Sequence, residues 1–157
     1  MITEEYKSEL FKKHTTDPEY GGEAVEYSGH ISNIINQTGV ETVLDYGAGK
    51  GELAHNLVLD HRVKVILYDP AIPQISAPPE PADMVVCVNV LDHVEDQYID
   101  EVLDDIKRCT NYINFIVISE TKEKPMEWWL LKIMERFSIQ SLVRSDMDFF
   151  VITKNEH

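Results

Sequence analysis

A glycine-rich turn that interrupts an apolar run constrains this chain more than any other feature. The run Thr42–Tyr46 has the character of a buried strand, and glycines follow at every second position, Gly47, Gly49 and Gly51. Glycine adopts positive φ without steric cost and allows the backbone to lie close to a ligand. A strand that ends in such a turn and leads into a helix presents main-chain N–H groups to a bound molecule. The motif therefore predicts a ligand site at the carboxyl end of a strand.

A second apolar run, Val63–Tyr68, ends in a carboxylate, Asp69. In nucleoside-binding α/β folds, a carboxylate at this place accepts hydrogen bonds from ribose hydroxyls. The glycine spacing is G-x-G-x-G, whereas dinucleotide sites have G-x-G-x-x-G. Asp45, just before the turn, disfavours a phosphate and favours a cation. The two runs together predict a site for a nucleoside cofactor that carries positive charge.

This pattern resembles motif I of the class I S-adenosylmethionine-dependent methyltransferases. Their cofactor carries a sulfonium and an amino group but no phosphate. The resemblance extends to residues 81–94, Pro-Ala-Asp-Met-Val-Val-Cys-Val-Asn-Val-Leu-Asp-His-Val, which look like the family's fourth strand and the acidic-histidine segment after it. These segments occur in the family's order and cover about two thirds of the chain. The resemblance implies S-adenosylmethionine as the cofactor.

A narrower resemblance is to small methyltransferase-like proteins of phages and bacteria. It is carried by Tyr-Asp-Pro-Ala-Ile-Pro at residues 68–73 and by Trp128 and Trp129 in a predicted helix. Such relatives have a longer connection before the Trp-Trp helix than the five residues 120–124 found here. Because adjacent helical residues cannot both face inward, we expect one tryptophan in the core and the other at a pocket or a dimer contact.

The candidate site divides into cofactor-binding and catalytic residues. The cofactor candidates are Asp45, Gly47, Gly49, Gly51, Asp69, Ile72, Asn89 and Tyr20. For Asp45, the alternatives are contact with the methionine ammonium through water and hydrogen bonding to the turn amides. His93 is the candidate general base because imidazole titrates near neutrality, and Asp92 would orient its ring or hold the acceptor. The alternative for His93 is a structural role at the start of a helix. No metal site is predicted, because Cys87 and Cys109 lack metal-ligand spacing.

The order of elements predicts an α/β protein with a reduced Rossmann-like methyltransferase sheet. We expect the sheet to be mostly parallel, with an antiparallel strand in a C-terminal hairpin. The prolines of residues 70–81 oppose a helix and a central strand, so the family's usual third strand should be missing. Beyond the strands already named, the expected elements are helices 23–37, 52–60, 95–108 and 125–137 and strands 84–89, 112–119, 139–143 and 149–153.

Length and charge limit the partners. The 157 residues fit one domain, 1–157, in which residues 1–22 would form an N-terminal helix followed by either a lid over the cofactor or a flexible linker. The formal net charge of −14 disfavours nucleic acid, whose binding depends on Lys and Arg. No apolar run is long enough to cross a membrane, and the two cysteines fit the reducing cytoplasm. A homodimer is left open.

The sequence leaves three functions open. The leading one is methyl transfer from S-adenosylmethionine to a small molecule or a protein side chain. The second is a non-catalytic protein that binds the cofactor or a partner, suggested by the shortened substrate region. The third is an enzyme that degrades S-adenosylmethionine by hydrolysis or elimination.

Overall fold

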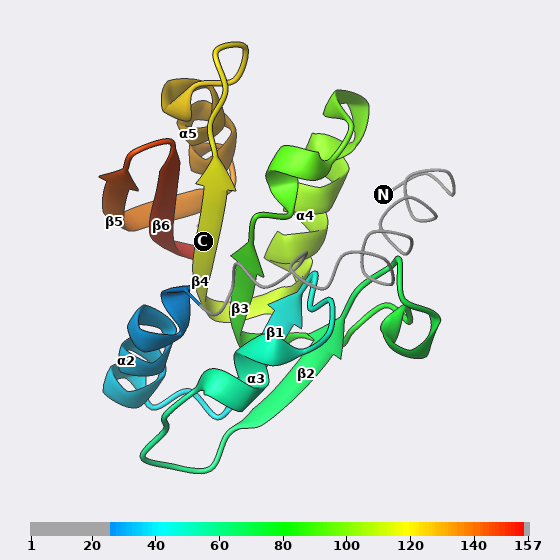
Figure 1. Cartoon of the computed structure of the whole chain (residues 1–157), viewed down its shortest axis with the longest axis vertical. Helices are drawn as coiled ribbons and strands as arrows, with labels where there is room; N and C mark the ends of the chain where they lie inside the picture. The colour runs from blue at the N-terminus through cyan, green and yellow to red at the C-terminus, as the bar shows by residue number, and fades with distance from the viewer. Residues whose placement is uncertain (1–25, 156–157) are drawn as a thin grey trace.

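A computed structural model describes residues 26–155 (Figure 1). Their main elements are α2 (Ser28–Thr38), β1 (Thr42–Tyr46), α3 (Glu52–Asn56), β2 (Lys64–Tyr68), β3 (Ala82–Val88), α4 (Ile99–Cys109), β4 (Thr110–Ser119), α5 (Met126–Met134), β5 (Phe137–Ser145) and β6 (Asp148–Asn155). Short 3-10 turns occupy Pro73–Ile75, Leu91–His93 and Asp96–Tyr98. Strands and helices alternate until a final pair of strands, as the sequence predicts.

The strands form one six-stranded sheet in the order β2-β1-β3-β4-β6-β5. The first four strands in this order pair in parallel, and β6 is antiparallel to both β4 and β5. Between β2 and β3 the described chain forms only the 3-10 turn Pro73–Ile75 and no strand, so β2 lies at the edge of the sheet. The predicted fold class, including the missing third strand, is therefore confirmed.

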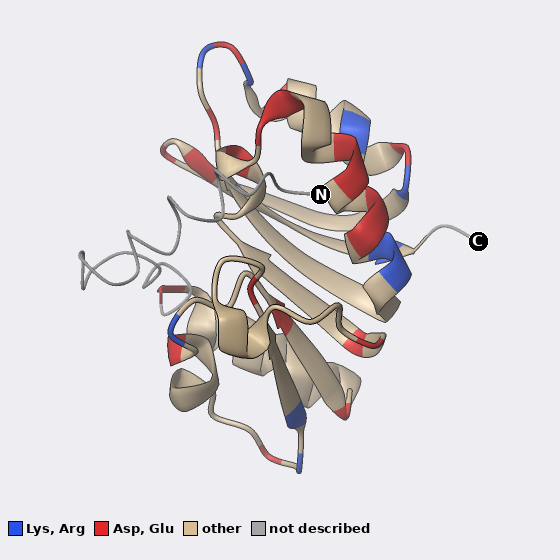
Figure 2. Ribbon diagram, turned by 90° about the vertical axis from the view of Figure 1, so that its right-hand side faces the viewer, with Lys and Arg blue, Asp and Glu red and all other residues tan. Residues whose placement is uncertain are grey.

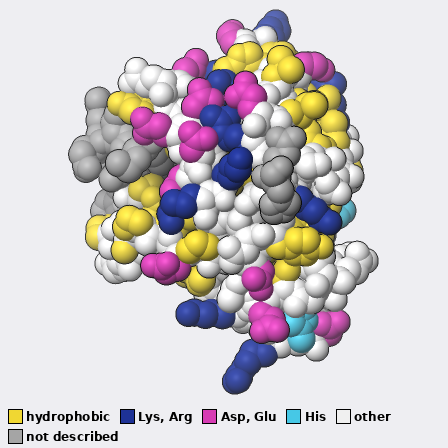
Figure 3. Space-filling view, turned by 180° about the vertical axis from the view of Figure 1, so that it is seen from behind, with side chains coloured by type: hydrophobic (Ala, Val, Ile, Leu, Met, Phe, Trp, Pro, Cys, Tyr) yellow, Lys and Arg dark blue, Asp and Glu magenta, His cyan; other side chains and the backbone are white. Residues whose placement is uncertain are grey.

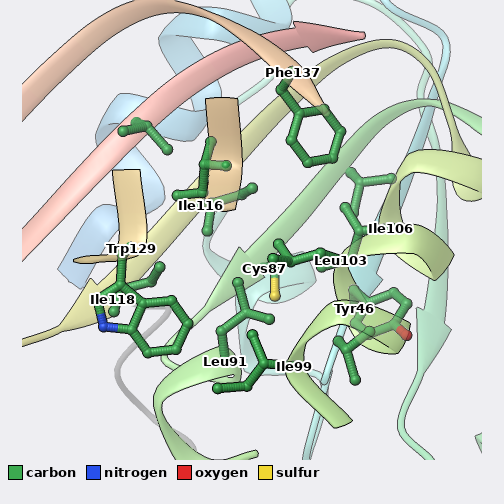
Figure 4. Packing of buried hydrophobic residues seen from close by; sticks show 14 of the residues in the cluster. Tyr46, Cys87, Leu91, Ile99, Leu103, Ile106, Ile116, Ile118, Trp129 and Phe137 are labelled. Atoms are coloured by element: carbon green, nitrogen blue, oxygen red, sulfur yellow. The ribbon is translucent and has the colours of Figure 1, made fainter. Parts of the chain in front are cut away.

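Helices cover both faces of the sheet, which explains why its central strands are apolar on both sides. One core joins α2 and α3 to the sheet, and its buried side chains include Ile31, Ile35, Leu53, Val43, Met84, Val86, Phe115 and Val117. The opposite core joins α4 and α5 to the sheet, and its buried side chains include Leu103, Ile106, Trp129, Ile133, Leu44, Cys87, Ile116 and Ile118. Figure 4 shows the Cys87 sulfur among the side chains of this second core.

A hollow lies between the carboxyl ends of β1 and β2, residues 70–78 and α4. Its volume is about 580 Å³, and its lining combines Tyr46 and Tyr68 with the acidic face of α4. The two rings lie 4.9 Å apart between centroids. The Tyr46 hydroxyl donates to Asp105 Oδ2 at 2.7 Å. This hydrogen bond links α4 to the carboxyl end of β1.

Two helices end earlier than the sequence predicts. The helix expected over residues 52–60 ends at Asn56, because the next residues bond to α2 instead. There the Val58 N–H donates to Ser32 Oγ at 3.0 Å, and the Asn36 side chain donates to the Val58 carbonyl. The helix expected over residues 125–137 ends at Met134, and β5 begins at Phe137. Tertiary hydrogen bonds and burial thus override the local helical pattern.

Acidic and basic side chains are interspersed on the surface (Figures 2 and 3). Arg136 shows how they pair, since it bonds Asp104 at 2.7 Å and Asp100 at 3.0 Å and so links α5 to α4. On the face seen in Figure 3, positive side chains alternate with negative ones and form no continuous basic patch. Within the described chain, no helix is long and apolar enough to cross a membrane.

Candidate functional site

The glycine turn after β1 is held by the neighbouring strand and packs against the segment after β3. Gly47 and Gly51 have φ of 86° and 76°, a region that favours glycine. The N–H of Gly47 donates to the Tyr68 carbonyl at 2.7 Å. A Cβ placed on Gly47 would lie 2.3 Å from Val90 Cγ2. The turn therefore needs glycine both for its backbone conformation and for its contact with the protein's own chain.

Asp69 fastens the turn from the end of β2. Its Oδ2 accepts the N–H of Gly49 at 3.1 Å, and its Oδ1 accepts the N–H of Ala71 at 3.0 Å. The residue is only 4% exposed. The bond to a turn amide that is one alternative for Asp45 is thus made by Asp69. A carboxylate oxygen can accept more than one hydrogen bond, so these contacts are compatible with bonds from ribose hydroxyls to Asp69.

Asp45 lies buried at the end of β1, beside Asp69. Burial, and then the negative charge of Asp69, raises its pKa to about 7. A cation next to this carboxyl group would favour the ionised form and lower its pKa. The site therefore suits a ligand that carries positive charge near Asp45 and that can hydrogen-bond to the turn and to Asp69. A cationic nucleoside such as S-adenosylmethionine fits this description.

A chain of polar side chains crosses the carboxyl ends of β3 and β4. Asn89 has a φ of 53°, unusual for a residue other than glycine, and its side chain donates to Ser119 Oγ at 2.8 Å. Ser119 donates in turn to Asp148 Oδ1 at 2.6 Å. The Tyr27 hydroxyl, just before α2, approaches Asp148 Oδ2 at 3.5 Å. Asn89 therefore lies at the sheet edge where its sequence position predicts it, among partners the sequence did not single out.

Asp92 and His93 occupy the 3-10 turn that follows this edge. Their side chains are 10% and 39% exposed, and His93 Nε2 lies 3.5 Å from Asp92 Oδ2. Burial raises the pKa of Asp92, and Asp148 adds to the rise, whereas His93 and a hydrogen bond from Asn89 oppose it. The structure thus brings the two catalytic candidates together and places both beside the polar chain.

The remaining candidates are placed as follows. Ile72 lies half-buried in the turn after Asp69, where its N–H donates to the Asp69 carbonyl at 3.1 Å. Tyr20 and the N-terminal helix and lid of residues 1–22 lie outside the described residues. Among residues 26–155, no group of three His, Cys, Asp or Glu side chains is placed to hold a metal ion.

The tryptophan pair and the cysteines occupy distinct places. Trp129 is buried in the core, and Trp128 is half-buried with the Lys124 and Lys132 ammonium groups 5.7 Å and 5.3 Å from its ring centroid. Both cysteines are buried, and burial raises the pKa of Cys109 to about 11. Such thiols remain protonated and unreactive near neutral pH.

Residues 10–145 of the chain match the protein family described as "Methyltransferase domain". A search of curated proteins found no match. Among solved structures, the 1,6-didemethyltoxoflavin-N1-methyltransferase of Burkholderia thailandensis, bound to 1,6-didemethyltoxoflavin and S-adenosylhomocysteine, has a TM-score of 0.73 at 16% identity. That match covers 96% of this chain and 87% of the other.

Two further solved structures share the fold. The N-methyltransferase NodS of Bradyrhizobium japonicum, in complex with S-adenosylhomocysteine, has a TM-score of 0.68 at 12% identity over 97% of this chain and 99% of NodS. The magnesium protoporphyrin IX methyltransferase of Synechocystis, with bound S-adenosylmethionine, has a TM-score of 0.62 at 15% identity over 91% and 84% of the two chains. At these identities the likeness concerns the fold alone.

Proposed function

Because the chain belongs to the methyltransferase-domain family, we propose that it binds S-adenosylmethionine and transfers a methyl group to a small molecule or a protein side chain. The observation that carries this proposal is the glycine turn fastened by Asp69, with the buried carboxyl group of Asp45 beside it. The bound cofactor supplies an electrophilic methyl group on a sulfonium. S-adenosylhomocysteine or S-adenosylmethionine in the similar structures agrees with this choice.

Each site residue then has a role in the proposal. The backbone of Gly47, Gly49 and Gly51 approaches the cofactor, and Asp45 receives its ammonium group through water. Asp69 accepts the ribose hydroxyls, and Ile72 flanks the adenine. Asn89, Asp92 and His93 lie where the acceptor approaches the methyl group, because ligands of such α/β folds bind at the carboxyl ends of the strands. Methyl transfer depends on close approach and alignment, to which His93 adds removal of a proton.

The proposal assigns the acceptor to small molecules or protein side chains rather than nucleic acid. The net charge of −14 would repel a phosphate backbone. The face in Figure 3 also lacks the continuous basic patch that a nucleic-acid partner requires.

The test is product analysis with S-adenosylmethionine labelled in its methyl group. Transfer of the label to an acceptor supports the proposal. Loss of the cofactor without a labelled acceptor would favour the degrading enzyme, and binding without turnover the non-catalytic protein. Gly49→Val, which fills the backbone approach, should remove activity. Gly29→Ala is the control, because a Cβ at Gly29 meets no atom of residues 26–155 within 4 Å.

A further inference from the structure

Two carboxylates lie at the acceptor side of the site and share one hydrogen-bonded network. We call Asn89, Asp92, Ser119 and Asp148 the carboxylate cluster. Asn89 donates to Ser119, and Ser119 donates to Asp148. Asn89 also lowers the pKa of Asp92. The Asp148 charge also raises the pKa of Asp92, so the two carboxyl groups interact electrostatically. Strands β3, β4 and β6 thereby bring both carboxylates to the same edge of the sheet.

The polar donors of this cluster are already used within it. The Ser119 hydroxyl has one proton and gives it to Asp148, and the Asn89 amide donates to Ser119. What the cluster still offers to a ligand is acceptor capacity on the two carboxylates. A group with several N–H donors and no acceptor, such as an ammonium, matches this lining better than a hydroxyl, which has a single donor.

One buried carboxylate oxygen of the cluster has no hydrogen-bond donor within the described residues. In the part of the chain that the structure describes, three buried side-chain atoms have no hydrogen-bond partner: Asp92 Oδ1, Trp129 Nε1 and Asn155 Oδ1. Only Asp92 Oδ1 belongs to an ionisable group, and nine tenths of the Asp92 side chain is buried. Within residues 26–155, no Lys or Arg forms an ion pair with Asp92 or Asp148. Leaving a buried carboxylate oxygen without a donor is costly, which points to a donor that arrives with a ligand.

We propose that the methyl acceptor is a primary amine, bound by the carboxylate cluster as an ammonium ion and methylated on nitrogen. This inference rests on the proposed methyltransferase function. One ammonium proton passes to the His93 imidazole, whose Nε2 lies 3.5 Å from Asp92 Oδ2, and this frees the nitrogen lone pair. The nitrogen then attacks the methyl carbon, the N–C bond forms, and the S–C bond breaks with its electron pair left on sulfur. The products are a protonated secondary amine and S-adenosylhomocysteine, and His93 later releases its proton to solvent.

The experiment pairs each amine with its hydroxyl analogue. 2-Phenylethylamine is compared with 2-phenylethanol, and N-acetyl-lysine methylamide with the analogue that has a hydroxyl in place of the amine. Methyl-labelled S-adenosylmethionine reports the atom that receives the label. We expect the label on nitrogen only. Asp92→Asn should lower kcat/KM for the amine by roughly 100-fold, the scale seen when one partner of a buried charge pair is removed.

Two further variants separate the inference from folding defects. Asp148→Asn, on another strand, should lower kcat/KM for the amine in the same direction. Asp146→Asn removes an equal charge from the exposed turn next to it and should leave kcat/KM unchanged. Calorimetry with S-adenosylhomocysteine, which reports the cofactor site, should give a Kd within about threefold of wild type for all three variants.

Several results would overturn the inference. They are label on the hydroxyl analogues, no transfer to either amine although S-adenosylhomocysteine binds, or full amine activity in Asp92→Asn or Asp148→Asn. If S-adenosylhomocysteine does not bind the wild-type chain, the proposed function itself fails and the amine assignment fails with it.

Discussion

The cofactor half of the site, at the ends of β1 and β2, and the acceptor half, at the ends of β3 and β4, differ in how many of their buried polar atoms are hydrogen-bonded within the protein. At the ends of β1 and β2, Asp69 accepts two backbone N–H groups and the glycine turn bonds to β2. At the ends of β3 and β4, the buried Asp92 Oδ1 has no donor within the described chain. A preformed half binds its ligand without reorganisation, whereas an incomplete half gains most when a ligand supplies the missing group. The cofactor side should therefore tolerate changes at the acceptor side, and the predictions below test that independence.

The largest effect is expected at the glycine turn. Gly47→Val would drive its side chain into Val90 and force a branched residue to positive φ. We expect a loss of about 2–4 kcal/mol in the free energy of unfolding, together with loss of cofactor binding. Denaturant titration measures the first and calorimetry the second. A Gly47→Val protein that binds S-adenosylhomocysteine like wild type would show that the turn does not form the site.

The next effect concerns His93. His93→Ala should lower turnover by roughly 10²–10⁴-fold, the contribution of a general base, and leave cofactor affinity nearly unchanged. Steady-state kinetics and calorimetry on the same preparation give both values. Preserved turnover would assign His93 a structural role, and a collapse of cofactor affinity would contradict the separation of the two halves.

A smaller effect is expected at Asp69. Asp69→Ala should weaken S-adenosylhomocysteine binding by roughly 1.5–3 kcal/mol, the scale of charge-assisted hydrogen bonds. Asp69→Asn should weaken it less, since its carbonyl oxygen still accepts one backbone N–H. Calorimetric Kd values decide the matter, and equal affinity in wild type and Asp69→Ala would exclude Asp69 from cofactor binding.

The mildest perturbation is a change of pH. The pKa of Asp45 is about 7 in the free protein, so this carboxyl group is protonated below pH 7 and ionised above it. Because a cationic ligand prefers the ionised form, its affinity should rise as pH increases from 6 to 8, by at most about tenfold per unit. Asp45→Asn should flatten this dependence. A wild-type affinity that does not change over this range would argue against contact between Asp45 and the cation.

Features that depend on residues close together in the sequence were predictable, and features that depend on strand pairing between distant residues were not. The glycine turn and the strand that ends at Asp69 are local patterns. The missing third strand likewise follows from the prolines of residues 70–81. The partnership of Ser119 with Asp148 depends on the register between β4 and β6, which pairs residues far apart in the chain. Asp148 lies one residue before the predicted strand 149–153, and a strand predicted to begin at Asp148 would have placed it in the hairpin.

Burial is the second property that the sequence did not reveal. Asp69 rather than Asp45 bonds to the glycine turn, because the carboxyl end of β2 lies against that turn in the folded sheet. The exposure of Asp92 is likewise fixed by how its 3-10 turn packs, and neighbouring residues in the sequence do not determine it. Residue types at the site were therefore predictable, and their hydrogen-bond partners were not.

The central claim is that the half of the site formed by β1 and β2 binds S-adenosylmethionine. Calorimetric titration of the full chain with S-adenosylhomocysteine, with NAD as the comparison ligand, tests it most directly. We predict saturable binding of S-adenosylhomocysteine that Gly49→Val abolishes and Gly29→Ala preserves, and weaker binding of NAD, because Asp45 and Asp69 disfavour phosphate. No binding of S-adenosylhomocysteine at saturating concentration, or tighter binding of NAD, would contradict the account.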